Sequence, residues 1–345
     1  VAHYNRSSGT TGEAKLVGIT HAQRAIRAAR ETAGFRRRRD DRLLAALPLS
    51  NTWARCMALS ELANGGAVVF RPATMTFGDL RRMAEAGTIT SVALTPPYVR
   101  DLLRANGNAL MLPGVRVLVA SAPLTRAERA RTRARITPEL FIEYATNETG
   151  PLAFATPEDL DEAPDCVGRV VDGVDAEVVD EALRPVPPGS MGELRFRDPM
   201  FPSRYAVAAS GSTSRFVDGW FYPGDAGTID SASRITVHGR IDDVINVGGS
   251  KVHPAAIESW LTADPRVIEA TAIGLPELRQ GEAPVAAVVL HEPVAESELM
   301  ALCRAAGDRL PMPARIVALP ELPRNPAGKV DRAALRELLR ARLGG

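Results

Sequence analysis

A short segment near the start of the chain combines glycine, serine and threonine in a way that suits phosphate binding. It reads Ser7-Ser8-Gly9-Thr10-Thr11-Gly12-Glu13-Ala14-Lys15. Glycine lets the backbone approach a ligand closely, exposed amides point at phosphate oxygens, and hydroxyl groups donate further hydrogen bonds. Lys15 adds a positive charge at the edge of the loop. The pattern G-x-x-x-x-G-K-[ST] does not occur, which disfavours an ordinary P-loop hydrolase, and a flexible linker remains the alternative.

Six further motifs place charged or aromatic residues beside turns and apolar runs. A carboxylate after a strand suits a ligand site, because ligands gather at the carboxyl ends of strands in open α/β sheets, although it can equally cap a helix or lie on the surface. The motifs are Tyr144-Ala145-Thr146-Asn147-Glu148, Gly192-Glu193-Leu194, Gly219-Trp220-Phe221-Tyr222-Pro223-Gly224-Asp225, Gly239-Arg240-Ile241-Asp242-Asp243, Gly248-Gly249-Ser250-Lys251-Val252 and Pro323-Arg324-Asn325-Pro326-Ala327-Gly328-Lys329.

With the phosphate segment, these motifs resemble the signature of the adenylate-forming superfamily, which includes acyl-CoA synthetases and the adenylation domains of nonribosomal peptide synthetases. The resemblance covers essentially the whole chain. It implies a ligase that uses ATP and Mg²⁺ to convert a carboxylic acid into an acyl-adenylate and pyrophosphate. Transfer to CoA or to the phosphopantetheine of a carrier protein would follow, and an amine acceptor stays open. Such catalysis is mostly positioning and charge neutralisation. The alternative is a non-catalytic nucleotide- or acyl-adenylate-binding module, or a subunit that needs a partner.

The resemblance assigns roles to the phosphate segment and to the motif that ends in Glu148. Glu148 would bind Mg²⁺, and Tyr144 would stack on adenine, or simply fill the edge of the sheet. Asn147 would contact a phosphate or carboxylate. The loop would hold the β- and γ-phosphates, with Thr10 acting in catalysis and the remaining binding residues being Ser7, Ser8, Gly9, Thr11, Gly12 and Lys15.

Two residues in the following motifs would contact the ribose. Asp225 follows Pro223-Gly224, where a turn aspartate is ordinarily a local hydrogen-bond acceptor. The resemblance implies instead that its carboxylate accepts from both ribose hydroxyls. Arg240 would add a contact to ribose or phosphate.

The last motifs imply a mobile domain. Asp242 would be the hinge, and the Gly248-Gly249 pair would line the path of the thiol, although a plain β-turn explains the pair equally well. Lys329 would bridge the substrate carboxylate and the α-phosphate while the domain is closed, which suits a mobile positive charge. A surface lysine is the ordinary interpretation.

The sequence departs from the family pattern in the motif around Glu148 and in a stretch near position 50. Ala145 replaces a glycine, and Asn147 replaces a hydroxyl residue with an amide that can still donate. Asn51 takes the place of a histidine beside the acyl pocket, and Trp53 lies close by. We therefore expect a small polar or aromatic acid as the substrate.

The phosphate segment begins at the seventh residue, whereas family members usually carry well over a hundred residues before it. We expect the first part of the large domain to be absent. Either the chain is a fragment, or the enzyme is naturally shortened and completed by a partner.

The elements that must position these residues indicate an α/β fold. Short apolar runs alternate with helical patterns between Leu43 and Tyr144, which is typical of a parallel sheet with covering helices. Pro96-Pro97 begins one helix, and Thr125 with Glu128 has the spacing of a capping box. We predict a truncated large domain over 1–240, with an α/β part over about 1–165 and a β-rich part over about 166–240. A small α+β domain would cover 241–345.

Composition excludes several classes of protein. The formal net charge of +1 gives no field to attract nucleic acid or an anionic membrane. The three cysteines are odd in number and lack metal-ligand spacing, which argues against a disulfide framework; they are Cys56, Cys166 and Cys303. No run approaches the roughly 18 apolar residues that span a bilayer. We expect a cytoplasmic protein, and we interpret Arg36-Arg37-Arg38-Arg39 as a solvated surface rather than a phosphate site.

Overall fold

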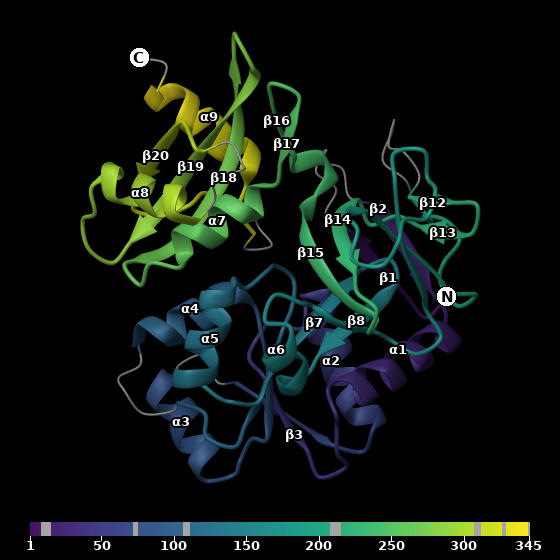
Figure 1. Cartoon of the computed structure of the whole chain (residues 1–345). Coiled ribbons are helices and arrows are strands. Elements are labelled where there is room, and N and C mark those ends of the chain that lie inside the picture. Colours follow the sequence, from purple (N-terminus) through teal and green to yellow (C-terminus); the bar gives the residue numbers. More distant parts are fainter. Residues whose placement is uncertain are drawn as a thin grey trace. The chain divides into compact units, whose positions relative to one another are not determined.

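The computed structural model of the chain divides into two compact units (Figure 1). The larger unit comprises Val1–Pro123 and Arg129–Val237, and the smaller comprises Leu124–Glu128 and His238–Gly345. Across the ranges described, no helix is both long and apolar enough to cross a bilayer. The structure describes residues 1–7, 15–71, 75–105, 111–207, 215–306, 312–325 and 329–343.

Parallel strands form the α/β part of the larger unit, in the spatial order β4, β3, β5, β6, β7. Each coincides with an apolar run in the sequence, so this part of the prediction is confirmed. Every residue of β5 and β6 is buried, as expected for central strands covered on both faces. The strands are β3 (Arg42–Ala45), β4 (Ala67–Phe70), β5 (Ser91–Leu94), β6 (Arg116–Val119) and β7 (Leu140–Thr146).

Helices cover both faces of these strands. In Figure 1, α3 and α4 lie on one side of the parallel strands, and α1 and α2 lie on the other. Two predicted helix starts are confirmed: α4 begins at Pro96, and the Glu128 amide donates to Thr125 Oγ1 (3.3 Å) in a capping box. The helices are α1 (His21–Gly34), α2 (Thr52–Ala63), α3 (Phe77–Glu85), α4 (Pro96–Ala105), α5 (Arg126–Arg135) and α6 (Pro157–Glu162).

The β-rich part continues the same hydrogen-bonded sheet. Strand β8 (Gly150–Ala155) runs antiparallel to β7, and β9, β15, β14, β11, β13 and β12 follow in that order, with β10 also paired to β11. This continuity could not be read from the change in sequence character near Val167. The added strands are β9 (Gly168–Val170), β10 (Asp175–Val179), β11 (Gly192–Arg197), β12 (Phe216–Val217), β13 (Trp220–Phe221), β14 (Asp225–Ile229) and β15 (Arg234–Arg240).

A separate two-stranded ladder carries the phosphate segment. Strands β1 (His3–Ser7) and β2 (Lys15–Ile19) pair antiparallel, and the register ends with Ser7 opposite Lys15. Residues 8–14 lie outside the described residues. The ladder therefore fixes where the segment leaves and rejoins the fold.

The smaller unit is a sheet with helices on both faces. Residues of β18 and β19 alternate between two apolar clusters, one shared with α7 and α8 and the other with α9, as the two-residue period of a strand requires. A proline begins the first helix of this unit, at Pro254. The elements are β16 (Ile245–Val247), β17 (Ser250–Val252), α7 (Pro254–Thr262), β18 (Val267–Glu277), β19 (Gly281–Leu290), α8 (Glu296–Ala306), β20 (Arg315–Ala318) and α9 (Arg332–Leu343).

One arginine of the run after α1 is buried, which corrects the interpretation of all four as solvated. Arg36, Arg38 and Arg39 are exposed, but Arg37 forms an ion pair with Glu61 in which both side chains are completely buried. The Arg37 guanidinium also lies 5.2 Å from the centre of the Phe35 ring. Burial raises the pKa of Glu61, and the charge of Arg37 opposes that shift. The pair is therefore part of the core of the larger unit.

Replacing Arg37 with methionine should destabilise the protein strongly, because the Glu61 carboxylate would stay buried without its partner. Losing one member of a buried pair typically costs about 3–5 kcal/mol. Urea unfolding of Arg37→Met should show such a loss, and the double variant Arg37→Met/Glu61→Met should recover most of it. Arg36→Met is the matched control, because its pair with Glu158 is exposed and is worth roughly 0–1 kcal/mol. Equal losses in the two single variants would contradict this prediction.

Candidate active site

The turn between β7 and β8 brings two of the predicted site residues, Asn147 and Glu148, close to the ladder that carries the phosphate segment. The amide of Thr149 donates to Thr146 Oγ1 (3.1 Å) and closes this turn. Gly150 follows with φ of 77°, and a Cβ there would lie 2.8 Å from the Arg27 side chain. Glycine is thus required both by the backbone conformation and by the close approach of Arg27.

Arg27 of α1 binds the backbone of this turn. Its guanidinium donates to the carbonyl oxygens of Asn147 (3.3 Å) and Glu148, and its side chain is buried. Burial lowers the pKa of Arg27 to about 10, which still leaves it charged at neutral pH. This buried cation therefore binds backbone carbonyls and stabilises the turn. The sequence analysis missed Arg27, although it lies three residues from Arg24 and four from Glu31 on an otherwise alanine-rich helix.

Asn147 contacts the ladder. Its side-chain amide donates to the backbone carbonyl of Arg6 (2.8 Å), and its own carbonyl accepts from the side chain of Asn5 (3.0 Å). Asn5 is 1% exposed, so this contact is buried. The amide that was predicted to meet a phosphate or carboxylate therefore already has a structural partner in β1.

Glu148 has a hydroxyl partner that the sequence analysis did not identify. Tyr205 donates its hydroxyl to Glu148 Oε1 (3.0 Å), and Glu148 is 9% exposed. Burial, followed by the negative charge of Glu148, raises the pKa of Tyr205, so the phenol stays protonated and can donate. Lys15 Nζ lies 5.1 Å from the centre of the Tyr205 ring. A single tyrosine outside any motif gives no signal in one sequence.

Tyr144 and Asp225 meet although they are 81 residues apart. The Tyr144 hydroxyl donates to Asp225 Oδ2 at 2.5 Å, from the end of β7 to the start of β14. The Tyr144 ring lies 6.0 Å from that of Phe196 on β11. The aromatic residue and the carboxylate predicted to bind adenine and ribose are thus neighbours at one place on the sheet.

The two residues predicted to lie in the acyl pocket also have structural roles. Asn51 caps α2 by accepting from the amide of Ala54 (3.1 Å), and Trp53 packs against the core cluster of the α/β part. The indole N–H of Trp53 donates to Glu143 Oε2 (2.6 Å). Glu143 is 4% exposed, and burial, with a smaller contribution from the charge of Glu31, raises its pKa to about 8.

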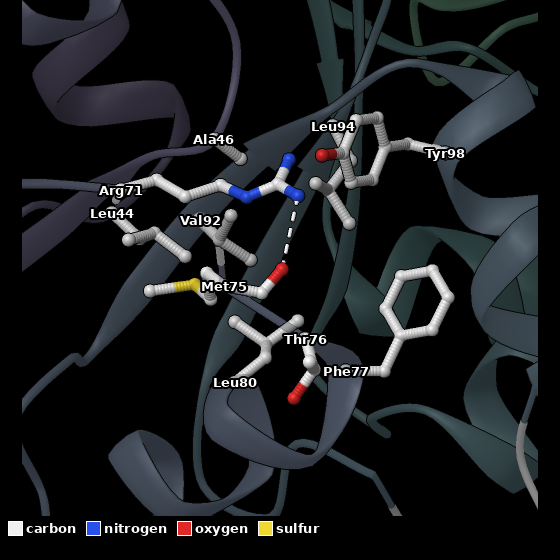
Figure 2. A pocket seen from close by; sticks show the side chains of 10 residues that line it. All are labelled: Leu44, Ala46, Arg71, Met75, Thr76, Phe77, Leu80, Val92, Leu94 and Tyr98. Carbon is white, nitrogen blue, oxygen red and sulfur yellow. Dashed lines mark hydrogen bonds between the residues drawn. The ribbon is translucent and has the colours of Figure 1, made fainter. Parts of the chain in front are cut away.

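A small apolar cavity lies at the carboxyl ends of β3 and β5 (Figure 2). Arg71 extends across it and donates to the carbonyl of Met75 (3.2 Å), while its guanidinium lies 5.5 Å from the centre of the Tyr98 ring. Parallel strands end at a common edge, so this cavity opens at the same edge of the sheet as the end of β7. Its other lining residues are Leu44, Ala46, Thr76, Phe77, Leu80, Val92 and Leu94.

The predicted residues of the smaller unit lie at turns. Arg240 Nη2 is 3.6 Å from Asp242 Oδ2 across a 3-10 turn over Ile241–Asp243. Gly248 and Gly249 have φ of 57° and 88° and join β16 to β17; such two-residue hairpins need positive φ at both positions. Lys329 is exposed, and its amide donates to Asn325 Oδ1 (3.1 Å).

The carboxylates present suit a magnesium ion rather than a metal held entirely by the protein. Among the described residues, no group of three or more histidine, cysteine, aspartate or glutamate side chains could hold a metal. Mg²⁺ usually takes only one or two protein carboxylates and completes its octahedron with water and substrate phosphates. Glu148, with Oε1 engaged by Tyr205, fits that limited role.

Two family models match this chain. The model of AMP-binding enzymes matches residues 3–206, and the model of the AMP-binding enzyme C-terminal domain matches 256–329. The chain belongs to the AMP-binding enzymes of the adenylate-forming superfamily, so the resemblance seen in the motifs is confirmed.

Individual relatives confirm the predicted fold class. The chain is 30% identical to a salicylyl-CoA synthase / salicylate adenylyltransferase of a Streptomyces species over 99% of its length, and it spans 64% of that relative. ATP-bound MatB from Rhodopseudomonas palustris matches with a TM-score of 0.87 and 26% identity, covering 98% of this chain and 68% of MatB. The amide bond synthetase McbA from Marinactinospora thermotolerans matches with a TM-score of 0.85 and 27% identity, covering 97% and 68%.

The buried carboxyl of Glu143 should make stability depend on pH. An unfolded glutamate ionises near pH 4.3, whereas the folded protein holds this proton up to about pH 8. The folded state binds more protons in between, so the stability from this group is full below about pH 4 and is lost as pH rises toward 8. Glu143→Gln keeps an acceptor for Trp53. Its stability relative to the wild type should therefore rise between pH 5 and 8, by on the order of 3 kcal/mol at about 1.4 kcal/mol per pKa unit.

Chemical unfolding at several pH values measures this difference. Glu158→Gln is the control, because pairing with Arg36 lowers the pKa of Glu158, so this carboxylate is ionised throughout the window and its difference from the wild type should stay flat. A flat difference for Glu143→Gln as well would show that the carboxyl is not protonated in the folded protein.

Proposed function

We propose that this chain activates a small carboxylic acid with ATP as an acyl-adenylate and then transfers the acyl group to the thiol of CoA or of a carrier-protein phosphopantetheine. The observation that carries the proposal is the clustering at the carboxyl end of β7 in a chain of this family: Tyr144 bonds to Asp225, and Glu148 lies next to the ladder that holds the phosphate segment. The chain spans 64% of the first relative, and the names of the relatives support the proposal without deciding the substrate.

The first step is an in-line displacement at the α-phosphorus of ATP. A carboxylate oxygen of the acid forms a new bond to phosphorus, and the bond to the bridging oxygen breaks so that pyrophosphate leaves with the electron pair. The acid is a weak nucleophile, so the protein must supply position and charge. Tyr144 would hold adenine and Asp225 would accept from the ribose hydroxyls, with Arg240 adding a contact. Residues 7–12 and Lys15 would surround the β- and γ-phosphates.

Magnesium would be held by Glu148 together with phosphate oxygens and water. When bound, this ion neutralises charge that develops on the phosphates. Oε2 of Glu148 has no hydrogen-bond partner among the described residues, which leaves one carboxylate oxygen available.

Lys329 would supply the mobile charge of the reaction. In this proposal the smaller domain, 241–345, turns about Asp242, and Lys329 bridges the carboxylate and the α-phosphate only during adenylation. Composition supports a special role for this residue: three lysines, Lys15, Lys251 and Lys329, occur among 42 basic residues, and all three lie in family-like motifs.

In the second step a thiolate attacks the acyl carbonyl and AMP departs. The Gly248-Gly249 turn would line the thiol path, because a Cβ-free backbone leaves room for a pantetheine arm, and no atom of the described residues lies within 4 Å of a Cβ built at either glycine. Asn51 and Trp53 would border the acyl pocket and favour a polar or aromatic acid. The similarity to an amide bond synthetase supports an amine as the second candidate acceptor.

Acid-dependent release of pyrophosphate tests the proposed function. The full chain, with ATP and Mg²⁺, should release pyrophosphate when supplied with at least one member of a panel of aromatic and polar carboxylic acids, and mass spectrometry should detect the matching acyl-AMP. Adding CoA, a pantetheinylated carrier protein or an amine then identifies the acceptor by the product formed. ATP binding with no adenylate from any acid, in protein shown to be folded, would favour the non-catalytic binding module instead.

Replacing Lys329 with alanine should reduce adenylate formation by at least about 100-fold, because one preorganised charge on a transition state is typically worth 2.7–4 kcal/mol. ATP affinity should change little, since the lysine is needed only in the closed pose. Single-turnover pyrophosphate release and calorimetric ATP binding measure the two effects separately. Arg340→Ala removes an exposed cation of α9 paired only locally with Glu337 and should leave both quantities near wild type. A Lys329→Ala rate within fivefold of the wild type would remove this residue from the mechanism.

A further inference from the structure

Tyr205 joins two parts of the candidate site that the motifs treat separately. Its hydroxyl donates to Oε1 of Glu148. The next two residues pair with the start of β2: the Ala206 amide donates to the Leu16 carbonyl (2.7 Å), and the Leu16 amide donates to the Val207 carbonyl (2.9 Å). One short segment therefore contacts both the Glu148 carboxylate and the strand on which the phosphate segment ends.

The aromatic ring of Tyr205 is fixed by packing. It meets the ring of Phe216 edge to face, with centroids 5.5 Å apart, and Phe216 in turn lies 5.0 Å from the buried Phe221 of β13. Lys15 Nζ also contacts the ring, 5.1 Å from its centre. Because these contacts hold the ring, the hydroxyl can act as a fixed donor and not as a freely rotating surface group.

The opposite strand of the ladder is tied to the same turn by Asn147. Its side chain donates to the Arg6 carbonyl, and its carbonyl accepts from Asn5. Both strands that frame the phosphate segment, β1 before it and β2 after it, thus reach the Glu148 turn. The two connections differ in kind, because each Asn147 contact joins a side-chain amide to a backbone carbonyl, whereas Tyr205 binds the Glu148 carboxylate itself.

We propose that Tyr205 is a positioning residue that orients the Glu148 carboxylate for Mg²⁺ and links that carboxylate to strand β2. This inference rests on the proposed function in one respect, that Glu148 is the residue which binds the metal. The phenol occupies Oε1 and directs Oε2 toward the ion. Hydrogen bonds to ligating carboxylates commonly have this effect, and their loss typically costs 10–100-fold in metal affinity or activity.

Tyr205→Phe tests the inference, because it removes the hydroxyl and keeps the ring packing. Calorimetric titration of Mg²⁺ into the full chain with saturating ATP and no acid should show an apparent Mg²⁺ dissociation constant raised about 10-fold. The Mg²⁺ concentration that gives half-maximal pyrophosphate release should rise by a similar factor, while rates at saturating Mg²⁺ recover most of the wild-type value. A merely structural role would instead lower thermal stability without moving the Mg²⁺ dependence.

Two further variants keep the test decisive. Tyr222→Phe removes a phenol that bonds to Arg195 (3.1 Å) and not to a carboxylate, so its Mg²⁺ dependence should match the wild type. Phe216→Leu keeps the Tyr205 hydroxyl but loosens the packing of its ring. It should shift the Mg²⁺ dependence in the same direction by a smaller factor. This variant therefore still tests the inference if Tyr205→Phe folds poorly.

The outcomes separate this inference from the proposed function. An Mg²⁺ dependence in Tyr205→Phe within twofold of the wild type overturns the role of Tyr205 and leaves the proposed activity standing. If the wild-type chain binds Mg²⁺ with ATP but forms no adenylate from any acid, the activity fails, and the calorimetric comparison still decides the role of Tyr205. A wild-type chain that binds no Mg²⁺ in the presence of ATP overturns both.

Discussion

The candidate site depends on a buried cation, the guanidinium of Arg27, which holds the carbonyl oxygens of the turn that carries Glu148. Desolvating a guanidinium is costly, and it is tolerated only where its hydrogen bonds are satisfied. Here the acceptors are the backbone carbonyls of Asn147 and Glu148. The hydrogen bonds that offset the desolvation cost therefore hold the main chain in place and do not join two side chains. The close approach of Arg27 also explains the glycine at position 150.

This arrangement directs Arg27 to the backbone of the turn and leaves the Glu148 carboxylate to accept from the Tyr205 hydroxyl. An ion pair between Arg27 and the Glu148 carboxylate would compete directly with a metal ion, whereas a phenol donor orients one oxygen and leaves the other free. Asp225 also accepts a hydrogen bond from a hydroxyl group, that of Tyr144. Elsewhere the chain pairs carboxylates with arginine freely, as in Arg30 with Asp198. At Glu148, a hydroxyl partner in place of an arginine is consistent with a carboxylate that can still bind a ligand.

Sequence alone predicted those parts of the fold and site that have a local signal. The apolar runs of β3 to β7, the proline start of α4 and the capping box of α5 are determined by neighbouring residues, and all appear as expected. Tyr144 and Asp225 were also both predicted, although their contact was not, because it depends on how a continuous sheet brings β7 and β14 together. Tyr205 and Arg27 could not be found in this way, since each works through a partner more than fifty residues distant.

Lysine and arginine differ chemically, and this difference bears on where each occurs in the chain. Arginine is the residue of choice for fixed, forked hydrogen bonds, and this chain uses it in nearly every structural ion pair, including the buried one with Glu61. Lysine is a compact charge on a flexible stem, better suited to a group that must approach and leave a phosphate. Nearly all basic residues of the chain are arginines. The three lysines lie in the phosphate segment (Lys15), next to the Gly248-Gly249 turn (Lys251) and in the loop before α9 (Lys329). That distribution is what the proposed function would require, with mobile point charges at these places and rigid forks elsewhere.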